Sequence, residues 1–258
     1  MGSALVEGAL NTGIITSDNL FLSDQIPESS KSLASKTQGQ IAESNLQIAQ
    51  TCDLVLLAIK PYQILELLAE ISPALPGNTA LISIAAGITL TKMEAASPNG
   101  TRIIRAMPNT PCMIGMGATG ITAGQHATPN DMAAAQNLLE SVGIVVTTTE
   151  PQLDAVTGVS GSGPAYIYTV IKAIAEQGTI EGLNPKDALQ LATRTVMGAA
   201  HMIEHTQKPP QELIDQVTSP GGTTLAGLAA LAEHDFEKTI ATGVHAATER
   251  SREIATES

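Results

Sequence analysis

Short, uninterrupted apolar runs alternate with helical patterns over the first half of this 258-residue chain, and this alternation limits the folds open to it. Runs without polar alternation are typical of strands that are buried on both faces, as in parallel sheets. Two segments with helical spacing, 63–71 and 129–142, lie between them. Alternating strands and helices predict a doubly wound α/β sheet. The predicted strands lie at 20–22, 54–59, 80–86, 102–107, 118–123 and 143–147.

Strand patterns stop after about residue 150. Helical spacing continues at 165–177, 210–217 and 236–254, and Asn184-Pro185 predicts another helix start, with an Asn cap and Pro in the first turn. We therefore expect an α/β domain over residues 1–149 and an all-helical domain over 150–258. Small residues let helices pack closely, on each other or on a second subunit. One face of the helix after Asn184 carries Ala188, Leu191, Thr195, Ala199 and Met202.

Composition and charge exclude several classes of function. The net charge of −12 argues against binding to nucleic acid or anionic membranes, which need Lys and Arg. No apolar run approaches the ~18 residues of a membrane span, and no signal-peptide pattern precedes Lys31, the first basic residue. Cys52 and Cys112 have neither disulfide nor metal-site spacing. We expect a cytoplasmic protein with no metal.

Polar, glycine and proline residues follow several predicted strands. Lys60-Pro61 ends the second run, Ala86-Gly87 the third, and residues 107–111 (Met-Pro-Asn-Thr-Pro) the fourth. In the helical half, residues 158–164 (Gly-Val-Ser-Gly-Ser-Gly-Pro) precede a helix. Ligands of open α/β sheets bind outside the carboxyl ends of the strands. These segments therefore predict a ligand site, although each one taken alone is an ordinary loop.

Residues 219–224 (Ser-Pro-Gly-Gly-Thr-Thr) lead into Leu225, Leu228 and Leu231, which repeat at helical spacing. Two glycines at a helix entrance let the backbone approach a ligand, and the first-turn N–H groups attract an anion. The hydroxyls of Thr223 and Thr224 can donate or accept a proton. The segment predicts a site for a small carboxylate beside a reacting group. The alternative is an ordinary helix cap.

Several motifs occur in an order and spacing that resemble the pyrroline-5-carboxylate reductase family, which performs the last step of proline biosynthesis. Together they cover essentially the whole chain. They are Ala58-Ile59-Lys60-Pro61, Ser83-Ile84-Ala85-Ala86-Gly87, the residues 105–111, Asp154-Ala155-Val156-Thr157-Gly158 with the residues 160–166, and the residues 219–224.

The resemblance implies a Rossmann-like dinucleotide-binding domain followed by an all-α dimerisation domain, in a homodimer or larger homo-oligomer. It implies hydride transfer from NADPH or NADH to the imine carbon of 1-pyrroline-5-carboxylate, giving L-proline. Asn45 would lie near the adenosine, and the other cofactor-binding residues would line the nicotinamide side and the cleft floor. The latter are Ala58, Ile59, Lys60, Pro61, Ala85, Ala86, Met107, Pro108 and Asn109.

The resemblance also implies substrate and catalytic residues. Thr224 would contact the imine nitrogen through its hydroxyl, with Ser219 in support, while the N–H groups of Gly222 and Thr223 would hold the carboxylate. Glu150 matches a position near the proline amine, although it also fits a surface carboxylate. The further predicted substrate-binding residues are Thr157 and Gln216.

The start of the chain departs from the family pattern. It begins at Met1-Gly2-Ser3-Ala4, inside the first helix, so the first strand and the glycine-rich phosphate loop of the family are missing. We expect that the sequence lacks roughly ten native residues of the dinucleotide-binding unit. Ser23-Asp24 stands where the family meets the adenine ribose and favours NADH, but Lys31 and Lys36 follow closely. The choice between NADH and NADPH stays open.

The sequence leaves two alternatives open. One is a related two-domain hydroxyacid-type dehydrogenase, for which Lys172 lies on the first long helix of the second half. The segment 219–224 argues against it. The other is a shortened, non-catalytic oligomer that binds the cofactor weakly. A measured affinity for the reduced cofactor distinguishes an intact dinucleotide site from one disabled by the missing segment.

Overall fold

The computed structural model describes residues 1–257 and divides into two compact units. The first unit contains Met1–Ser162 together with the chain from His245 onward, and the second contains Gly163–Val244. The expected boundary at 149/150 follows the end of the strand patterns in the sequence. The two units instead group the segments that contact one another in the structure. The segment 150–162 and the end of the last helix belong to the unit that contains the sheet.

The first unit contains a five-stranded sheet in the order β3 (Leu54–Leu57), β4 (Ala80–Ser83), β5 (Arg102–Met107), β6 (Gly117–Ala123), β7 (Gly143–Thr147). The strands β3, β4 and β5 are parallel, as predicted. The strand β6 instead runs antiparallel to β5, and β7 runs parallel to β6. The link from β5 to β6 holds only a 3₁₀ turn, Thr110–Ile114, which is too short for the crossover that a parallel pair needs.

A separate two-stranded parallel sheet pairs β1 (Phe21–Leu22) with β2 (Gln40–Ile41), joined by α2 (Pro27–Thr37). The run at 20–22 predicts β1, but β2 has no counterpart among the predicted strands. It is two residues long and exposed, so it carries no apolar pattern. The prediction of strands buried on both faces also fails for β7, where Ile144 and Val146 are 61% and 55% exposed.

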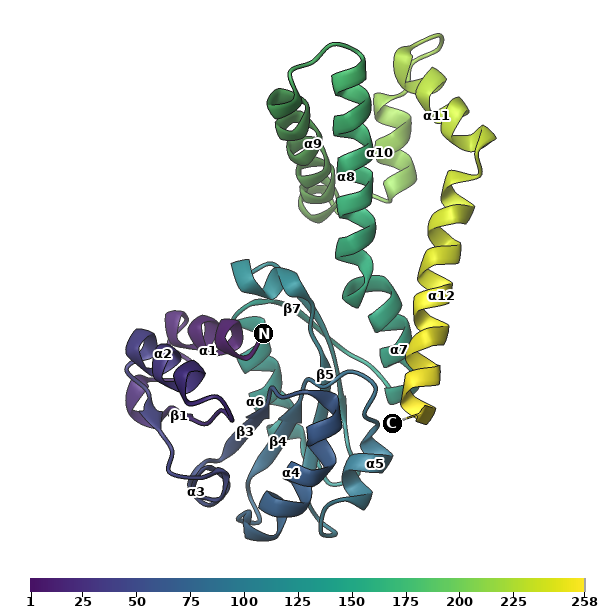
Figure 1. Ribbon diagram of the computed structural model, residues 1–258. Coiled ribbons are helices and arrows are strands. Elements are labelled where there is room, and N and C mark those ends of the chain that lie inside the picture. Colours follow the sequence, from purple (N-terminus) through teal and green to yellow (C-terminus); the bar gives the residue numbers. More distant parts are fainter. Residues whose placement is uncertain (258) are drawn as a thin grey trace. The chain divides into compact units, whose positions relative to one another are not determined.

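Helices cover both faces of the five-stranded sheet (Figure 1). Side chains from α3 (Asn45–Thr51), α4 (Ile64–Ile71) and α5 (Leu90–Ala95) form one apolar core with Ile103 of β5. Side chains from α1 (Gly2–Asn11) and α6 (Pro129–Glu140) form the other, with Ile104 and Ala106. Successive residues of β5 thus serve opposite faces, as strand geometry requires. The expected Rossmann-like α/β architecture is confirmed.

The chain is helical after the sheet, as predicted. A short α7 (Leu153–Val156) continues into a π-helical turn, Thr157–Gly161. The long helices follow, and the predicted cap of α9 is present, since the Asn184 side chain accepts the Lys186 N–H at 3.0 Å. The helices are α8 (Gly163–Ile180), α9 (Pro185–Thr206), α10 (Pro210–Val217), α11 (Thr223–Glu233) and α12 (Phe236–Glu257).

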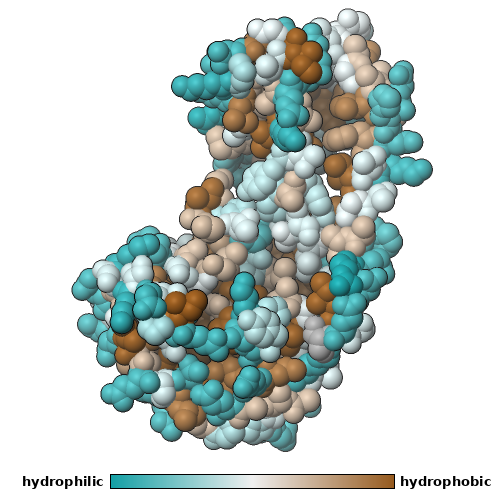
Figure 2. All heavy atoms as spheres, viewed as in Figure 1, coloured by the Kyte–Doolittle hydropathy of each residue, from teal (hydrophilic) through white to brown (hydrophobic). Residues whose placement is uncertain are grey.

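The second unit buries little of its apolar surface. Its core cluster consists of Ala175, Ala188 and Ala192, where α8 packs on α9. On the predicted α9 face only Ala188 is buried, while Leu191 and Met202 are 56% and 48% exposed. Figure 2 shows brown apolar residues among polar ones on these helices. An apolar surface of this extent is typical of a protein interface.

Thr119 on β6 is a polar exception in the core. Its side chain is 2% exposed, and its Oγ1 has no hydrogen-bond partner among the described residues. We expect Thr119→Val to raise the free energy of unfolding by about 1 kcal/mol, because valine keeps the shape and removes an unsatisfied hydroxyl.

Urea unfolding of Thr119→Val would test this, with Thr79→Val as the control. Thr79 is similarly buried, but its Oγ1 donates to the Cys52 carbonyl oxygen at 3.0 Å, so its replacement should destabilise the chain. A loss of stability in both variants would contradict the expectation for Thr119.

Both cysteines are free thiols. Partial burial, with a further contribution from Asp53, raises the pKa of the Cys52 thiol, so it stays protonated at neutral pH. Within residues 1–257, no three His, Cys, Asp or Glu side chains gather into a possible metal site. No described helix combines the length and apolarity that crossing a membrane would require.

Candidate cofactor and substrate sites

The predicted nicotinamide residues lie at one edge of the five-stranded sheet. Since β3, β4 and β5 are adjacent and parallel, the segments that follow them meet at their shared carboxyl edge. These segments are Ala58–Pro61 after β3, Ala85–Ala86 after β4 and Met107–Asn109 at the end of β5. The sequence therefore places these motifs at a common edge, where α/β sheets bind ligands.

Local hydrogen bonds shape the loop after β3. Pro61 begins a 3₁₀ turn, and the Lys60 N–H donates to Gln63 Oε1 at 3.3 Å. Gln63 Nε2 in turn donates to Gln25 Oε1 at 2.6 Å, which joins this loop to the segment after β1. The Lys60 side chain is exposed. It can therefore neutralise an anionic group near the sheet edge without being desolvated.

The amino end of α1 lies close to the same edge. A Cβ added to Gly2 would be only 2.8 Å from Ala58 Cβ, so the backbone of α1 closely approaches the loop after β3. The first turn of α1 has no side-chain cap and no acidic residue. Uncapped N–H groups and the helix dipole favour an anion there. These residues therefore fit the phosphates of a dinucleotide cofactor.

The predicted adenosine residues also come together. Ser23, directly after β1, donates from its Oγ to Asn45 Oδ1 at 2.8 Å. Asp24 Oδ1 accepts the Ile26 N–H at 2.8 Å, which fixes the carboxylate just before α2. Lys36 pairs with Glu7 at 3.8 Å and is 67% exposed. The Asp24 carboxylate suits free ribose hydroxyls, while the exposed Lys36 suits a ribose phosphate, so these residues do not choose between NADH and NADPH.

Asn109 connects the end of β5 with the π-helical turn. Its Oδ1 accepts the Ala118 N–H at 2.9 Å, and its Nδ2 donates to the Ser160 carbonyl oxygen at 3.0 Å. The residue is 8% exposed. Because both ends of the carboxamide are engaged within the protein, Asn109 shapes the predicted cleft floor rather than offering a free side chain to a ligand. Met107 lies beside the same turn, next to Gly161.

We expect Asn109→Leu to lower the free energy of unfolding by about 1–3 kcal/mol for each buried group left unpaired, since leucine has a similar size but forms no hydrogen bond. Asn99→Leu serves as the control. Asn99 is exposed and bonds His126 Nε2 at 2.9 Å, so its loss should change stability by less than about 0.5 kcal/mol. Urea unfolding measures both, and equal effects would contradict a structural role for Asn109.

Glu150 is engaged with two other segments. Its Oε1 accepts the Leu90 N–H at 2.5 Å and lies 3.1 Å from Arg105 Nη1. The Arg105 side chain is 5% exposed and that of Glu150 26%. Glu150 is thus the partner of a buried cation. The sequence predicts a substrate contact for Glu150 and does not predict its pairing with Arg105. The signal for Arg105 is a cation with apolar residues on both sides within the run 102–107, whereas Arg102 stands at its start.

Two further predicted substrate residues have local partners. Thr157 Oγ1 donates to the Leu153 carbonyl oxygen at 2.9 Å, and Gln216 Nε2 donates to Glu212 Oε1 at 3.1 Å. The Gln216 side chain lies on an exposed part of α10. Their roles toward a substrate stay predictions.

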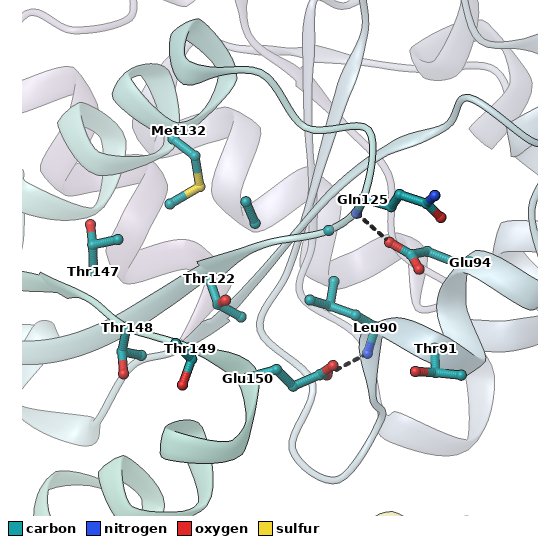
Figure 3. Close-up of a pocket in the computed structure, with 12 residues that line it drawn as sticks. Leu90, Thr91, Glu94, Thr122, Gln125, Met132, Thr147, Thr148, Thr149 and Glu150 are labelled. Carbon is teal, nitrogen blue, oxygen red and sulfur yellow. Dashed lines mark hydrogen bonds between the residues drawn. The ribbon is translucent and has the colours of Figure 1, made fainter.

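A cavity of about 580 Å³ lies beside Glu150 (Figure 3). It is near the carboxyl ends of β6 and β7, which are antiparallel to β5, so it lies away from the sheet edge that carries the cofactor residues. No motif in the sequence predicts it. Its lining includes Leu90, Thr91, Glu94, Thr122, Gln125, Met132, Thr147, Thr148, Thr149 and Glu150.

The segment 219–224 forms the predicted helix entrance in the second unit. Gly222 is the N-cap of α11, and Gly221 has a φ of 70°, which favours glycine. The Gly222 N–H donates to the Ser219 carbonyl oxygen at 2.9 Å, so this group is used in the turn. Thr223 and Thr224 follow in the first turn, which has no side-chain cap. Their N–H groups, rather than that of Gly222, are suited to an anion.

Comparisons with known proteins show the family of the chain. Residues 150–254 match the family model described as pyrroline-5-carboxylate reductase dimerisation, and residues 1–87 match NADP oxidoreductase coenzyme F420-dependent. A pyrroline-5-carboxylate reductase of Methanosarcina acetivorans is 41% identical over 254 residues, which is 98% of this chain and 94% of that protein. The chain belongs to the pyrroline-5-carboxylate reductase family.

Solved structures of pyrroline-5-carboxylate reductases have the same fold. The enzyme of Coxiella burnetii matches with a TM-score of 0.92 and 30% identity, covering 98% of this chain and 94% of its own. The Plasmodium falciparum enzyme, solved with NADP bound, matches with a TM-score of 0.85 and 32% identity over 99% and 94%. A ketol-acid reductoisomerase at 15% identity shares the fold alone.

Membership of the pyrroline-5-carboxylate reductase family disfavours both alternatives. Lys172, the candidate for a hydroxyacid-type dehydrogenase, is 70% exposed and pairs with Glu176 one turn along α8. The chain is an oxidoreductase of proline biosynthesis that uses NAD(P)H.

Proposed function

We propose that this chain reduces 1-pyrroline-5-carboxylate to L-proline with NAD(P)H, using the carboxyl edge of β3–β5 for the cofactor and the start of α11 for the substrate. The convergence of Ala58–Pro61, Ala85–Ala86 and Met107–Asn109 at one sheet edge carries this proposal, together with the family membership. When bound, the cofactor supplies a hydride to the imine carbon. The protein's own residues bind and orient the cofactor and the imine, and they supply a path for the proton.

The cofactor-binding residues divide by the part of the dinucleotide they suit. Ser23 and Asn45 offer polar groups for the adenosine, and the amino end of α1 offers N–H groups for the phosphates. Ala58 and Ala86 are small and exposed, so a flat nicotinamide ring can lie against the backbone there. In this proposal, Lys60 adds a positive charge at the same edge.

The start of α11 suits the substrate. A carboxylate accepts hydrogen bonds from the first-turn N–H groups of Thr223 and Thr224 and is favoured by the helix dipole. The half-buried Thr224 hydroxyl then contacts the imine nitrogen, directly or through water. A hydroxyl of ordinary pKa is a weak acid, so Thr224 positions the proton that the nitrogen acquires. Ser219 supports this turn through its carbonyl oxygen.

The second unit functions as a dimerisation surface in this proposal. Its cluster of three buried alanines is small, while large apolar residues of α8–α11 are exposed. A second copy of the chain is the partner that the matched dimerisation model indicates. Covering this surface removes apolar area from water and gives an obligate homo-oligomer. The exposed apolar residues of this surface include Ile167, Ile174, Leu189, Leu191, Ile203, Val217, Leu225 and Leu231.

The experiment that tests the function is the oxidation of NADPH and NADH, in parallel, by the purified chain with 1-pyrroline-5-carboxylate. Consumption of the reduced cofactor that depends on the imine, with L-proline as the product, is the expected result. Cofactor binding without turnover would instead show that the sheet edge works while the substrate assignment fails.

A further inference from the structure

The ion pair between Arg105 and Glu150 joins three segments that carry proposed site residues. Arg105 lies on β5, two residues before Met107. Glu150 begins the 3₁₀ turn Glu150–Gln152, which leads to α7 and the π-helical turn. Leu90, whose N–H is bonded to Glu150, is the first residue of α5. The loop between β4 and Leu90 contains Ala85 and Ala86, so the contact lies where the proposed nicotinamide loop ends.

One carboxylate oxygen makes both contacts. Glu150 Oε1 accepts the Leu90 N–H at 2.5 Å and is 3.1 Å from Arg105 Nη1. Figure 3 shows the Glu150 side chain pointing toward Leu90 at the edge of the cavity. A carboxylate at the first turn of a helix stabilises its amino end, and Thr89 Oγ1 caps the same turn by accepting the Lys92 N–H at 3.3 Å. The amino end of α5 is therefore held by the Thr89 side chain and by the Glu150 carboxylate.

We propose that Glu150 is a positioning residue for the nicotinamide loop rather than a contact of the substrate. Arg105 neutralises the carboxylate and fixes its direction, and the carboxylate fixes Leu90. Because α5 cannot shift at its amino end, the loop that ends there keeps Ala85 and Ala86 at the sheet edge. This inference rests on the proposed function, since it assigns the loop to the nicotinamide.

The test is Glu150→Gln in the full chain, with Glu94→Gln as the matched control. The introduced glutamine loses the charge that pairs with Arg105, so the direction of its amide oxygen toward the Leu90 N–H is no longer fixed, and the buried Arg105 charge is left unbalanced. Glu94 lies on α5 with Leu90 and lines the same cavity as Glu150, but its Oε1 accepts the Gln125 N–H at 2.6 Å, away from the loop. We expect the KM for NADPH to rise about tenfold in Glu150→Gln, the effect of losing one good hydrogen bond. The KM for 1-pyrroline-5-carboxylate should stay within about twofold.

Hydrogen exchange gives a second readout that needs no turnover. Amides of residues 84–92 should exchange faster in Glu150→Gln than in the wild type, and at the wild-type rate in Glu94→Gln. If Glu150→Gln does not fold, the double variant Arg105→Met with Glu150→Gln removes both charges and should fold, because no unpaired charge is then buried. It should show the same faster exchange.

Three results would overturn the inference. A rise only in the KM for 1-pyrroline-5-carboxylate would mean that Glu150 contacts the substrate. Unchanged exchange at 84–92 would mean that the ion pair does not hold the loop. Unchanged NADPH affinity despite faster exchange would mean that the loop does not serve the nicotinamide. If the wild-type chain shows no turnover, the proposed function fails, while exchange and NADPH titration still decide whether Glu150 positions a cofactor loop.

Discussion

Thr224→Ala is expected to lower kcat/KM for the reduction of 1-pyrroline-5-carboxylate by at least about a hundredfold, the lower end of the effect of a group that assists proton transfer. Thr224 lies in the first turn of α11, beside the Gly221-Gly222 turn, and is half-buried. Its hydroxyl is the polar group that we assign to the imine nitrogen. Alanine removes that group and leaves the first-turn N–H groups and the helix in place, so the proton is no longer positioned.

Steady-state kinetics measure the effect, and Thr224→Ser is the matched control because it keeps the hydroxyl. The serine variant should retain activity within about tenfold of the wild type, since only a methyl group is lost. NADPH affinity should be unchanged in both variants, because the cofactor is assigned to the sheet edge of the first unit. Equal losses in the serine and alanine variants would contradict a role for the hydroxyl.

Gly143→Ala is expected to lower the free energy of unfolding by about 3 kcal/mol or more. Gly143 opens β7 opposite Gly117 of β6, and a Cβ there would lie 2.1 Å from the Gly117 carbonyl oxygen and 2.4 Å from its nitrogen. Backbone atoms of a paired strand cannot rotate away as a side chain does. The φ of 152° adds strain for any residue with a Cβ. Overpacking and backbone strain each cost about 1–3 kcal/mol.

Urea unfolding of Gly143→Ala tests this, with Gly77→Ala as the control. Nothing lies within 4 Å of a Cβ at Gly77, so its replacement should be neutral or slightly stabilising. A Gly143→Ala variant as stable as Gly77→Ala would show that β6 and β7 do not pair as described.

The sequence predicts those parts of the fold that local patterns encode. Continuous apolar runs predict β3, β4 and β5, and Asn184-Pro185 predicts the start of α9. The direction of β6 is not encoded in its own apolar pattern; it follows from the short connection after β5. The strand β2 and the helix α5 are too short for a periodic signal, with two and six residues. The length of the connection therefore decides the direction of β6, and the shortness of β2 and α5 hides them from a reading of residue types.

The sequence likewise predicts one part of the candidate site and not the other. The motifs predict which loops meet, because the carboxyl ends of adjacent parallel strands share one edge. They do not predict what each side chain bonds to. Asn109 has a partner 51 residues away, and Glu150 has partners 45 and 60 residues away. Such tertiary partners depend on packing across elements, so a motif indicates the place of a residue but not whether its polar atoms are already engaged.

Following the hydride itself tests the proposed reaction most directly. NADPH that carries deuterium at the transferred position of C4 is supplied to the purified chain with 1-pyrroline-5-carboxylate, and the product is examined by mass spectrometry and NMR. We expect L-proline with one deuterium on Cδ, the ring carbon that is bonded to nitrogen and does not carry the carboxylate. Oxidised cofactor with unlabelled proline, or no proline at all, would contradict it.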